Sequence, residues 1–141
     1  MNNQDLAPLL KKNGLRDTQS RRMVLEALRK SKHAASPYDL QKDIARRGGA
    51  INTVTVYRIL RVLEELGLAH RHPCDGRYVL CTLPERKGHH GFLHCVRCGD
   101  IEEFSSRSLC WAENRVARVA RFRPSEHVSE ILGMCRACQL K

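Results

Sequence analysis

Two pairs of cysteines constrain the fold of this chain more than any other feature of its sequence. Cys95 and Cys98 form one pair, Cys135 and Cys138 form the other, and each pair has the C-x2-C spacing. One pair alone is weak evidence, because redox motifs share the spacing, but two pairs supply the four thiolates of a tetrahedral structural zinc site. The stretch between the pairs is longer than in a simple zinc ribbon, so we expect a small α/β unit within it. The alternative is two unrelated pairs of reduced thiols.

The composition is that of one ordinary domain or two small ones. The chain has 141 residues, of which 42% are hydrophobic, and no apolar run approaches the roughly 18 residues needed to span a bilayer. Its N-terminus lacks the basic and apolar regions of a secretory signal. Seven cysteines, an odd number, argue against a fully paired disulfide framework and indicate a reducing compartment. We therefore expect a cytoplasmic protein without a membrane partner.

The chain is strongly basic, and the excess charge is concentrated in its first half. The formal net charge is +10 and the isoelectric point is near 9.7. Residues 1–83 contain 15 Lys and Arg against 8 Asp and Glu, a balance of +7, whereas residues 84–141 contain 10 against 7, a balance of +3. Such a charge is typical of a protein with a polyanionic partner, although it also serves solubility.

The first half has the pattern of a helix-turn-helix. Helices are predicted over residues 5–12, from Asp17 or Thr18 through Leu28, from Ser36-Pro37 to Arg47, and from Asn52 to Leu66. In the last helix, Val56, Leu60 and Leu63 recur at the spacing of a buried stripe, and Gly67 is a typical residue to follow a helix end. The opposite face carries Thr55, Arg58, Arg61 and Glu65.

A β-hairpin is predicted immediately after these helices. It comprises residues 68–71 and 77–81, joined by a turn that carries the Asp75-Gly76 signal. This order, helices followed by a hairpin, is that of a winged helix. It indicates duplex DNA binding with the last helix in the major groove. The predicted DNA contacts are Tyr38, Thr55, Tyr57, Arg58 and Arg61.

The second half is predicted to be a separate unit. We place a winged-helix domain at 1–82, a hinge at 83–88, which is polar and contains proline and glycine, and a dimerisation domain at 89–141. The last has predicted strands at 92–93, 101–104 and 127–132 and a helix over 108–122, whose apolar stripe is Leu109, Ala112, Val116 and Val119. This β-β-α-β unit is too small to bury much core, so zinc and a partner subunit are expected to stabilise it. The fold class is α+β.

With these residues in view, the chain resembles the ferric uptake regulator superfamily over nearly its whole length. The motifs that carry the resemblance are Gly14-Leu-Arg with Thr18 and Arg22, Thr55-Val-Tyr-Arg58 with Leu66-Gly67, the histidine cluster at 89–94, Cys95-x-x-Cys98-Gly99 with Glu103-Phe104, and the C-terminal cysteine pair. The resemblance implies a homodimeric, metal-activated transcriptional regulator of operator DNA. It also implies a metal pocket at the junction of the two domains, whose occupancy sets the spacing of the DNA-reading helices.

Within the superfamily, the chain is most similar to the zinc uptake regulators. Iron-sensing members typically have a glutamate where this chain has Cys81, and a thiolate site favours zinc over Mn or Fe. By this resemblance the sensing ligands are His70, Cys81, one of His89 or His90, and Glu103. It implies about two zinc ions per subunit and a repressor of zinc uptake genes, with no small organic substrate. Alternatively, Cys81 is an ordinary buried cysteine and His70 a phosphate contact.

A further metal site of the family uses positions that correspond here to His89, Cys110 and His127. We expect that site to be absent or altered, because Cys110 stands at the position of a carboxylate and Gly91 replaces a cluster residue. Three other classes are open: a regulator that senses another metal or peroxide through thiol chemistry, an enzyme, and an RNA-binding zinc module. Zinc deaminase chemistry is disfavoured, since neither cysteine pair follows proline and no His-x-Glu occurs.

Overall fold

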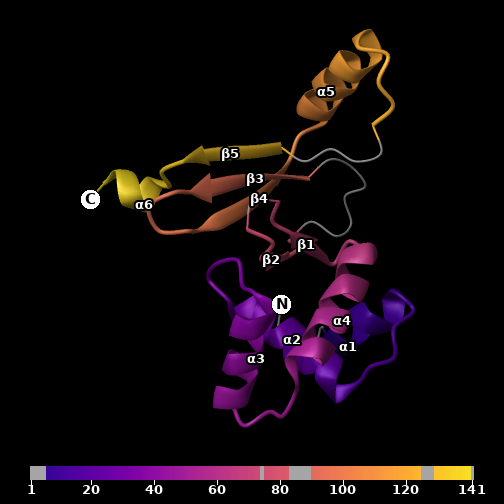
Figure 1. The fold of residues 1–141 in the computed structure, drawn as a ribbon, viewed down its shortest axis with the longest axis vertical. Coiled ribbons are helices and arrows are strands. Elements are labelled where there is room, and N and C mark those ends of the chain that lie inside the picture. Colours follow the sequence, from indigo (N-terminus) through magenta and orange to yellow (C-terminus); the bar gives the residue numbers. More distant parts are fainter. Residues whose placement is uncertain (1–5, 74, 83–89, 125–128, 141) are drawn as a thin grey trace. The chain divides into compact units, whose positions relative to one another are not determined.

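The computed structural model describes residues 6–73, 75–82, 90–124 and 129–140 of the chain (Figure 1). These residues form two compact units, Met1–Cys81 and Thr82–Lys141. The mixture of helices and sheet confirms the predicted α+β class. The expected hinge at 83–88 lies outside the described residues. None of the described helices is long and apolar enough to cross a membrane.

The N-terminal unit consists of four helices followed by a two-stranded hairpin. The elements are α1 (Leu6–Lys12), α2 (Gln19–Lys30), α3 (Pro37–Arg46), α4 (Thr53–Glu65), β1 (Ala69–Arg71) and β2 (Tyr78–Leu80). The helices begin where the sequence provides caps, because the side chains of Thr18, Ser36 and Asn52 accept hydrogen bonds from the first turns. Ser36 and Asp39 form a reciprocal capping box at the start of α3.

One aliphatic core holds the four helices and the hairpin together. The predicted stripe of α4 is buried, since Val56, Leu60 and Leu63 are each 0% exposed. They pack in one cluster with Leu10 of α1 and with side chains of α2, α3 and the hairpin. The cluster contains a single aromatic residue, Tyr78, among those that are fully buried, which agrees with the low aromatic content of the chain. The core fixes α4 with its polar face outward.

The hairpin has the form expected of a wing. β1 and β2 are antiparallel, with Ala69 opposite Leu80 and Arg71 opposite Tyr78. Tyr78 also exchanges two backbone hydrogen bonds of 2.9 Å with Ala35, which ties the wing to the segment before α3. Gly76 has a φ of +69°, so the turn requires the glycine of the Asp-Gly signal.

The C-terminal unit is built on a three-stranded sheet with the order β4-β3-β5. β3 (His90–Cys95) pairs antiparallel with β4 (Ile101–Ser105) and parallel with β5 (Ser129–Gly133), while α5 (Arg107–Val119) connects β4 to β5. The predicted β-β-α-β order is present, and α5 ends at Val119 rather than at 122. The last strand comprises Ser129–Gly133 in the described residues, and its predicted start at His127 lies outside them. A short helix, α6 (Arg136–Gln139), follows β5 and was not predicted.

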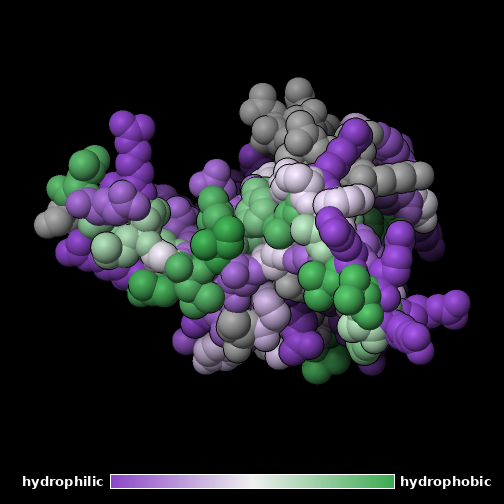
Figure 2. All heavy atoms as spheres, turned by 90° about the horizontal axis from the view of Figure 1, so that it is seen from above, coloured by the Kyte–Doolittle hydropathy of each residue, from purple (hydrophilic) through white to green (hydrophobic). Residues whose placement is uncertain are grey.

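The apolar stripe of α5 is exposed in the single chain. Val116 is 70% and Val119 80% exposed, and no residue of α5 is fully buried. The helix extends away from the sheet of its own unit, with hydrophobic side chains at the surface (Figures 1 and 2). Strand residues Leu93 and Ile131 are also exposed, at 39% and 55%. Both surfaces have the character of faces that a further chain covers.

Candidate metal centres and nucleic-acid interface

Four cysteine thiols meet at one end of the C-terminal sheet. Cys95 ends β3, Cys98 follows in the turn before β4, Cys135 precedes α6, and Cys138 lies within α6. Their sulfur atoms all lie within 4.8 Å of one another, and Cys98 Sγ is 3.8 Å from Cys135 Sγ. The parallel pairing of β3 with β5 explains this meeting, because it places Cys95 opposite Gly133, just before the second pair.

Backbone N–H groups surround the sulfur of Cys95. The amide of Cys135 donates a hydrogen bond to Cys95 Sγ at 3.3 Å. Hydrogen bonds from the amides of Cys135 and Cys98 lower the pKa of Cys95 to about 6, whereas burial raises the pKa of Cys138 to about 12. Four thiolates this close repel one another, so a divalent cation is needed for all four to ionise together. The donor set and its spacing fit a tetrathiolate zinc ion.

Arg97 joins the two cysteine-bearing segments directly. Its Nη1 donates a 2.8 Å hydrogen bond to the carbonyl oxygen of Cys138, across 41 positions of sequence. The guanidinium also brings positive charge to a cluster that is anionic when it binds zinc through four thiolates. Sequence reasoning missed this residue, because nothing in a C-x2-C pattern indicates which intervening side chain bonds to the other pair.

The wing places His70 and Cys81 on one face of the hairpin. The amide of Cys81 donates a 2.9 Å hydrogen bond to Leu68 O, which continues the β1–β2 ladder by one step. Because His70 pairs with Val79, His70 and Cys81 are diagonal neighbours on the same face. Cys81 is 6% exposed, and His70 is half-buried. A thiolate and an imidazole on the same face of a hairpin can bind one metal ion that prefers soft ligands.

A second pair, His90 and Glu103, lies on the C-terminal sheet. His90 Nδ1 is 2.6 Å from Glu103 Oε1, and the Glu103 side chain is 2% exposed. The other carboxylate oxygen accepts hydrogen bonds from the backbone N and the Oγ1 of Thr82, at 2.7 and 2.9 Å. Thr82 therefore fixes the orientation of the Glu103 carboxylate. No motif in the sequence indicates this role of Thr82. His89, the alternative histidine, lies outside the described residues.

Of the remaining predicted metal positions, the structure describes Cys110. Cys110 is half-buried on α5, where its sulfur accepts a 3.5 Å hydrogen bond from Asn114 Nδ2. The other two positions, His89 and His127, lie outside the described residues.

Helix α4 carries four of the five predicted DNA contacts, and α3 carries the fifth. Asn52 Oδ1 accepts from Thr55 N at 2.8 Å, which fixes the helix start. Tyr57 is 49% exposed, and Arg58 and Arg61 are exposed and form no ion pair with another described residue. Tyr38, on α3, is 55% exposed with Lys42 Nζ 4.5 Å from its ring centre. These cationic and aromatic groups are the types that contact phosphates and base edges.

A winged helix followed along the chain by a unit that gathers four thiols is typical of metal-binding transcription regulators. The chain belongs to the ferric uptake regulator family, whose model matches residues 12–132. The family consists of metalloregulators of transcription rather than enzymes.

Relatives and solved structures agree with this membership. The ferric uptake regulation protein of Legionella pneumophila is 34% identical over 131 residues, covering 92% of this chain and 96% of the relative. A structure of a zinc uptake regulator complexed with zinc and DNA superposes with a TM-score of 0.88 at 27% identity, covering 99% of this chain and 97% of that one. The ferric uptake regulator of Vibrio cholerae gives a TM-score of 0.60 at 28% identity, covering 92% and 98%.

Proposed function

We propose that this protein is a zinc-responsive repressor of zinc uptake genes, which binds operator DNA as a homodimer when a sensing site is filled with zinc. The observation that carries the proposal is the donor set of two pairs, His70 with Cys81 in the wing and His90 with Glu103 on the sheet. One thiolate, two imidazoles and one carboxylate make a four-coordinate set that suits zinc. Since the pairs belong to different units, a zinc ion that binds both would restrict how the wing moves relative to the sheet.

A second zinc ion has a structural role in this proposal. Cys95, Cys98, Cys135 and Cys138 would hold it in a closed tetrathiolate shell, as is usual for structural sites. The ion would join the end of β3 to α6 and so stabilise a unit with little core of its own. Together the two sites give about two zinc ions per subunit.

The exposed apolar surfaces of the C-terminal unit support the homodimer. The α5 stripe and the strand residues Leu93 and Ile131 are exposed in one chain. A second copy presents the same surfaces, so a two-fold axis allows each α5 to cover apolar surface of the partner. Such a dimer would also present two copies of α4 to successive turns of duplex DNA. We propose that the protein acts in the cytoplasm.

The relatives indicate two candidate metals, zinc and iron. The structural neighbour complexed with zinc and DNA supports zinc, whereas relatives including that of Legionella pneumophila are named for ferric uptake. The presence of Cys81 in the donor set favours zinc over Fe(II), because the thiolate is a soft ligand. Iron is the second candidate.

The deciding experiment measures metal content and DNA binding on the same preparation. The dimer is treated with a mild chelator, then titrated with Zn²⁺, Fe²⁺ or Mn²⁺ under reducing, anaerobic conditions while operator binding is followed by fluorescence anisotropy. We expect Zn²⁺ to restore binding at a lower free concentration than Fe²⁺ or Mn²⁺. Restoration by Fe²⁺ at the lower concentration would assign the protein to iron, and metal-independent binding would reject metal sensing.

Replacement of Arg58 by alanine tests the reading face of α4. If the guanidinium contacts a base edge, Arg58→Ala should weaken operator binding by about 1–3 kcal/mol, with a much smaller effect on random DNA. Arg16→Ala is the comparison, since a phosphate contact weakens all sequences alike and lowers the salt dependence. Equal losses on operator and random DNA would make Arg58 a phosphate contact instead.

Replacement of Arg97 by alanine tests the contact between the two cysteine-bearing segments. Arg97→Ala removes the hydrogen bond to Cys138 O and the positive charge. A strong chelator should therefore remove zinc faster, because changes next to the metal ligands cost roughly 10–100-fold in metal affinity. The release is followed with a chromogenic thiol-competitive chelator. Arg136→Ala, an exposed arginine of α6, is the control and should release zinc at the parent rate. An unchanged rate in Arg97→Ala would remove this role.

A further inference from the structure

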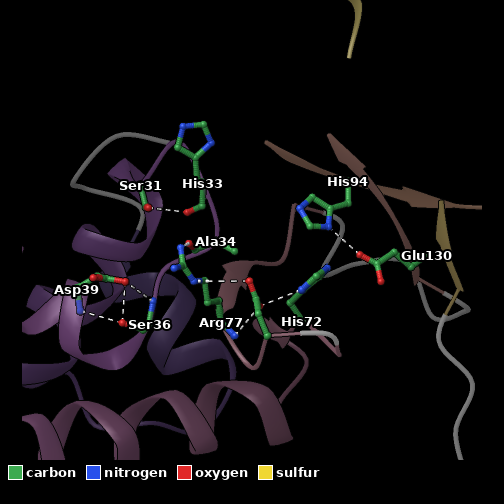
Figure 3. A network of polar contacts seen from close by, with 10 residues as sticks. Ser31, His33, Ala34, Ser36, Asp39, His72, Arg77, His94 and Glu130 are labelled. Carbon is green, nitrogen blue, oxygen red and sulfur yellow. Dashed lines mark hydrogen bonds and ion pairs between the residues drawn. The ribbon is translucent and has the colours of Figure 1, made fainter. Parts of the chain in front are cut away.

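A second histidine–glutamate pair lies on the face of the sheet that carries His90 and Glu103. His94 Nδ1 is 3.0 Å from Glu130 Oε1, a contact between β3 and β5 (Figure 3). The His94 side chain is 22% exposed and that of Glu130 10% exposed. Nothing proposed above for the four cysteines or the sensing site uses either residue.

The strand register places the His90–Glu103 and His94–Glu130 pairs at matching positions on either side of Phe92. Alternate residues of β3 share a face, so His90, Phe92 and His94 lie on the same side of the sheet. Phe92 stands opposite Glu103 in β4 and opposite Glu130 in β5. Each glutamate therefore flanks the buried Phe92, and each bonds to the histidine two residues away along β3. The sheet presents one imidazole–carboxylate pair on either side of a single phenyl ring.

The chemistry of this pair suits a divalent cation. Zinc binds imidazole nitrogen and carboxylate oxygen atoms at about 2.0–2.2 Å, so two such donors on one ion lie roughly 3 Å apart. His94 Nδ1 and Glu130 Oε1 are 3.0 Å apart, a separation at which one ion can bind both. A bound cation would also stabilise the largely buried carboxylate of Glu130, because positive charge offsets the cost of burying an anion.

We propose that His94 and Glu130 bind a further zinc ion, weaker than the two ions of the proposed function. The sheet supplies two ligands instead of four, and water or another side chain completes the shell. Fewer protein ligands mean lower affinity, so the site fills only after the other two. Occupancy would therefore report free zinc at concentrations above those that saturate the sensing site. The inference does not depend on whether the sensing site exists.

The test counts zinc at buffered free concentrations. The reduced dimer is dialysed against a series of zinc buffers, and bound metal is measured by plasma mass spectrometry. We expect the parent to take up one weak zinc per subunit beyond its tighter ions, and His94→Ala and Glu130→Gln each to lose that ion alone. Glu102→Gln is the matched control, because Glu102 is exposed on β4 and stands opposite Leu93, on the other face of the sheet. It should keep the weak ion.

Two further measurements separate this site from its alternatives. Cobalt bound by His94 and Glu130 should lack the sulfur-to-metal charge-transfer band that a thiolate site gives, because no cysteine belongs to the pair. In a Cys81→Ser background, His94→Ala should still remove one weak ion, which distinguishes the pair from the sensing site. The proposal is overturned if His94→Ala and Glu130→Gln, with unfolding temperatures like that of the parent, bind as much zinc as the parent at every concentration. The contact is then an ordinary ion pair.

Discussion

Cys95→Ser should unfold the C-terminal unit and abolish dimerisation and structural zinc together. Binding of a structural zinc ion by cysteine ligands supplies on the order of 10 kcal/mol of folding free energy, which is comparable with the whole stability of an ordinary domain, about 5–15 kcal/mol. The C-terminal unit depends on that contribution more than most, since α5 contributes no fully buried residue to a core. Serine has the shape of cysteine and a slightly smaller side chain, and its hydroxyl does not replace a thiolate in the shell.

The measurement combines zinc content, sedimentation and circular dichroism on one sample. We expect Cys95→Ser to lose about one zinc per subunit, to sediment as a monomer or aggregate, and to lose sheet signal. Cys110→Ser is the control, because Cys110 lies on α5 outside the four-thiol cluster, and it should behave as the parent. A Cys95→Ser protein that stays folded and dimeric would remove the structural role of this site.

The features that follow local sequence rules could be predicted from the sequence. Thr18, Ser36 and Asn52 cap helices because their side chains can accept backbone hydrogen bonds, and this preference acts over three residues. The apolar stripe of α4 is likewise a local pattern, and it is buried as predicted. The two C-x2-C pairs were recognisable because the spacing reflects the geometry of one ion.

Features that depend on strand pairing could not be predicted in the same way. The contact of His94 with Glu130 spans 36 positions and exists because β5 lies parallel to β3 in one register. A shift of one residue would turn Glu130 to the other face. The bonds from Thr82 to Glu103 and from Arg97 to Cys138 could not be predicted either. The sequence around Thr82 or Arg97 does not indicate which residue each one bonds. For the α5 stripe, periodicity identified an apolar face but not what covers it.

The choice between His89 and His90 shows how register decides a ligand. The sequence allows either histidine, depending on whether positions are counted from Cys81 or from Cys95. In the described strand His90 shares a face with Phe92, and Phe92 stands opposite Glu103, so the imidazole of His90 reaches the carboxylate. This geometry supports His90 in the proposed sensing set. His90→Ala is therefore expected to reduce the zinc response of DNA binding more than His33→Ala, a change at an exposed histidine of the other unit.

Cys81→Ser should separate zinc sensing from folding. The side chain of Cys81 belongs to the proposed sensing set. Its backbone N–H donates the hydrogen bond to Leu68 O that continues the wing ladder, and serine retains this bond. The substituted protein should therefore keep the structural zinc, stay dimeric and unfold near the temperature of the parent. It should lose the sensing ion, because oxygen replaces the softest of the four ligands.

The consequence is measured in a zinc titration of operator binding. In the parent, zinc should raise operator affinity by roughly 5- to 150-fold, the usual range of coupling between two sites, and operator DNA should tighten zinc binding by the same factor. In Cys81→Ser both effects should disappear, because a ligand can shift an equilibrium only through its different affinity for the two states. Cys110→Ser again serves as the control and should respond as the parent does. If Cys81→Ser gains operator affinity with zinc as the parent does, the sensing ion is bound elsewhere, and Cys110 with His127 is the next place to test.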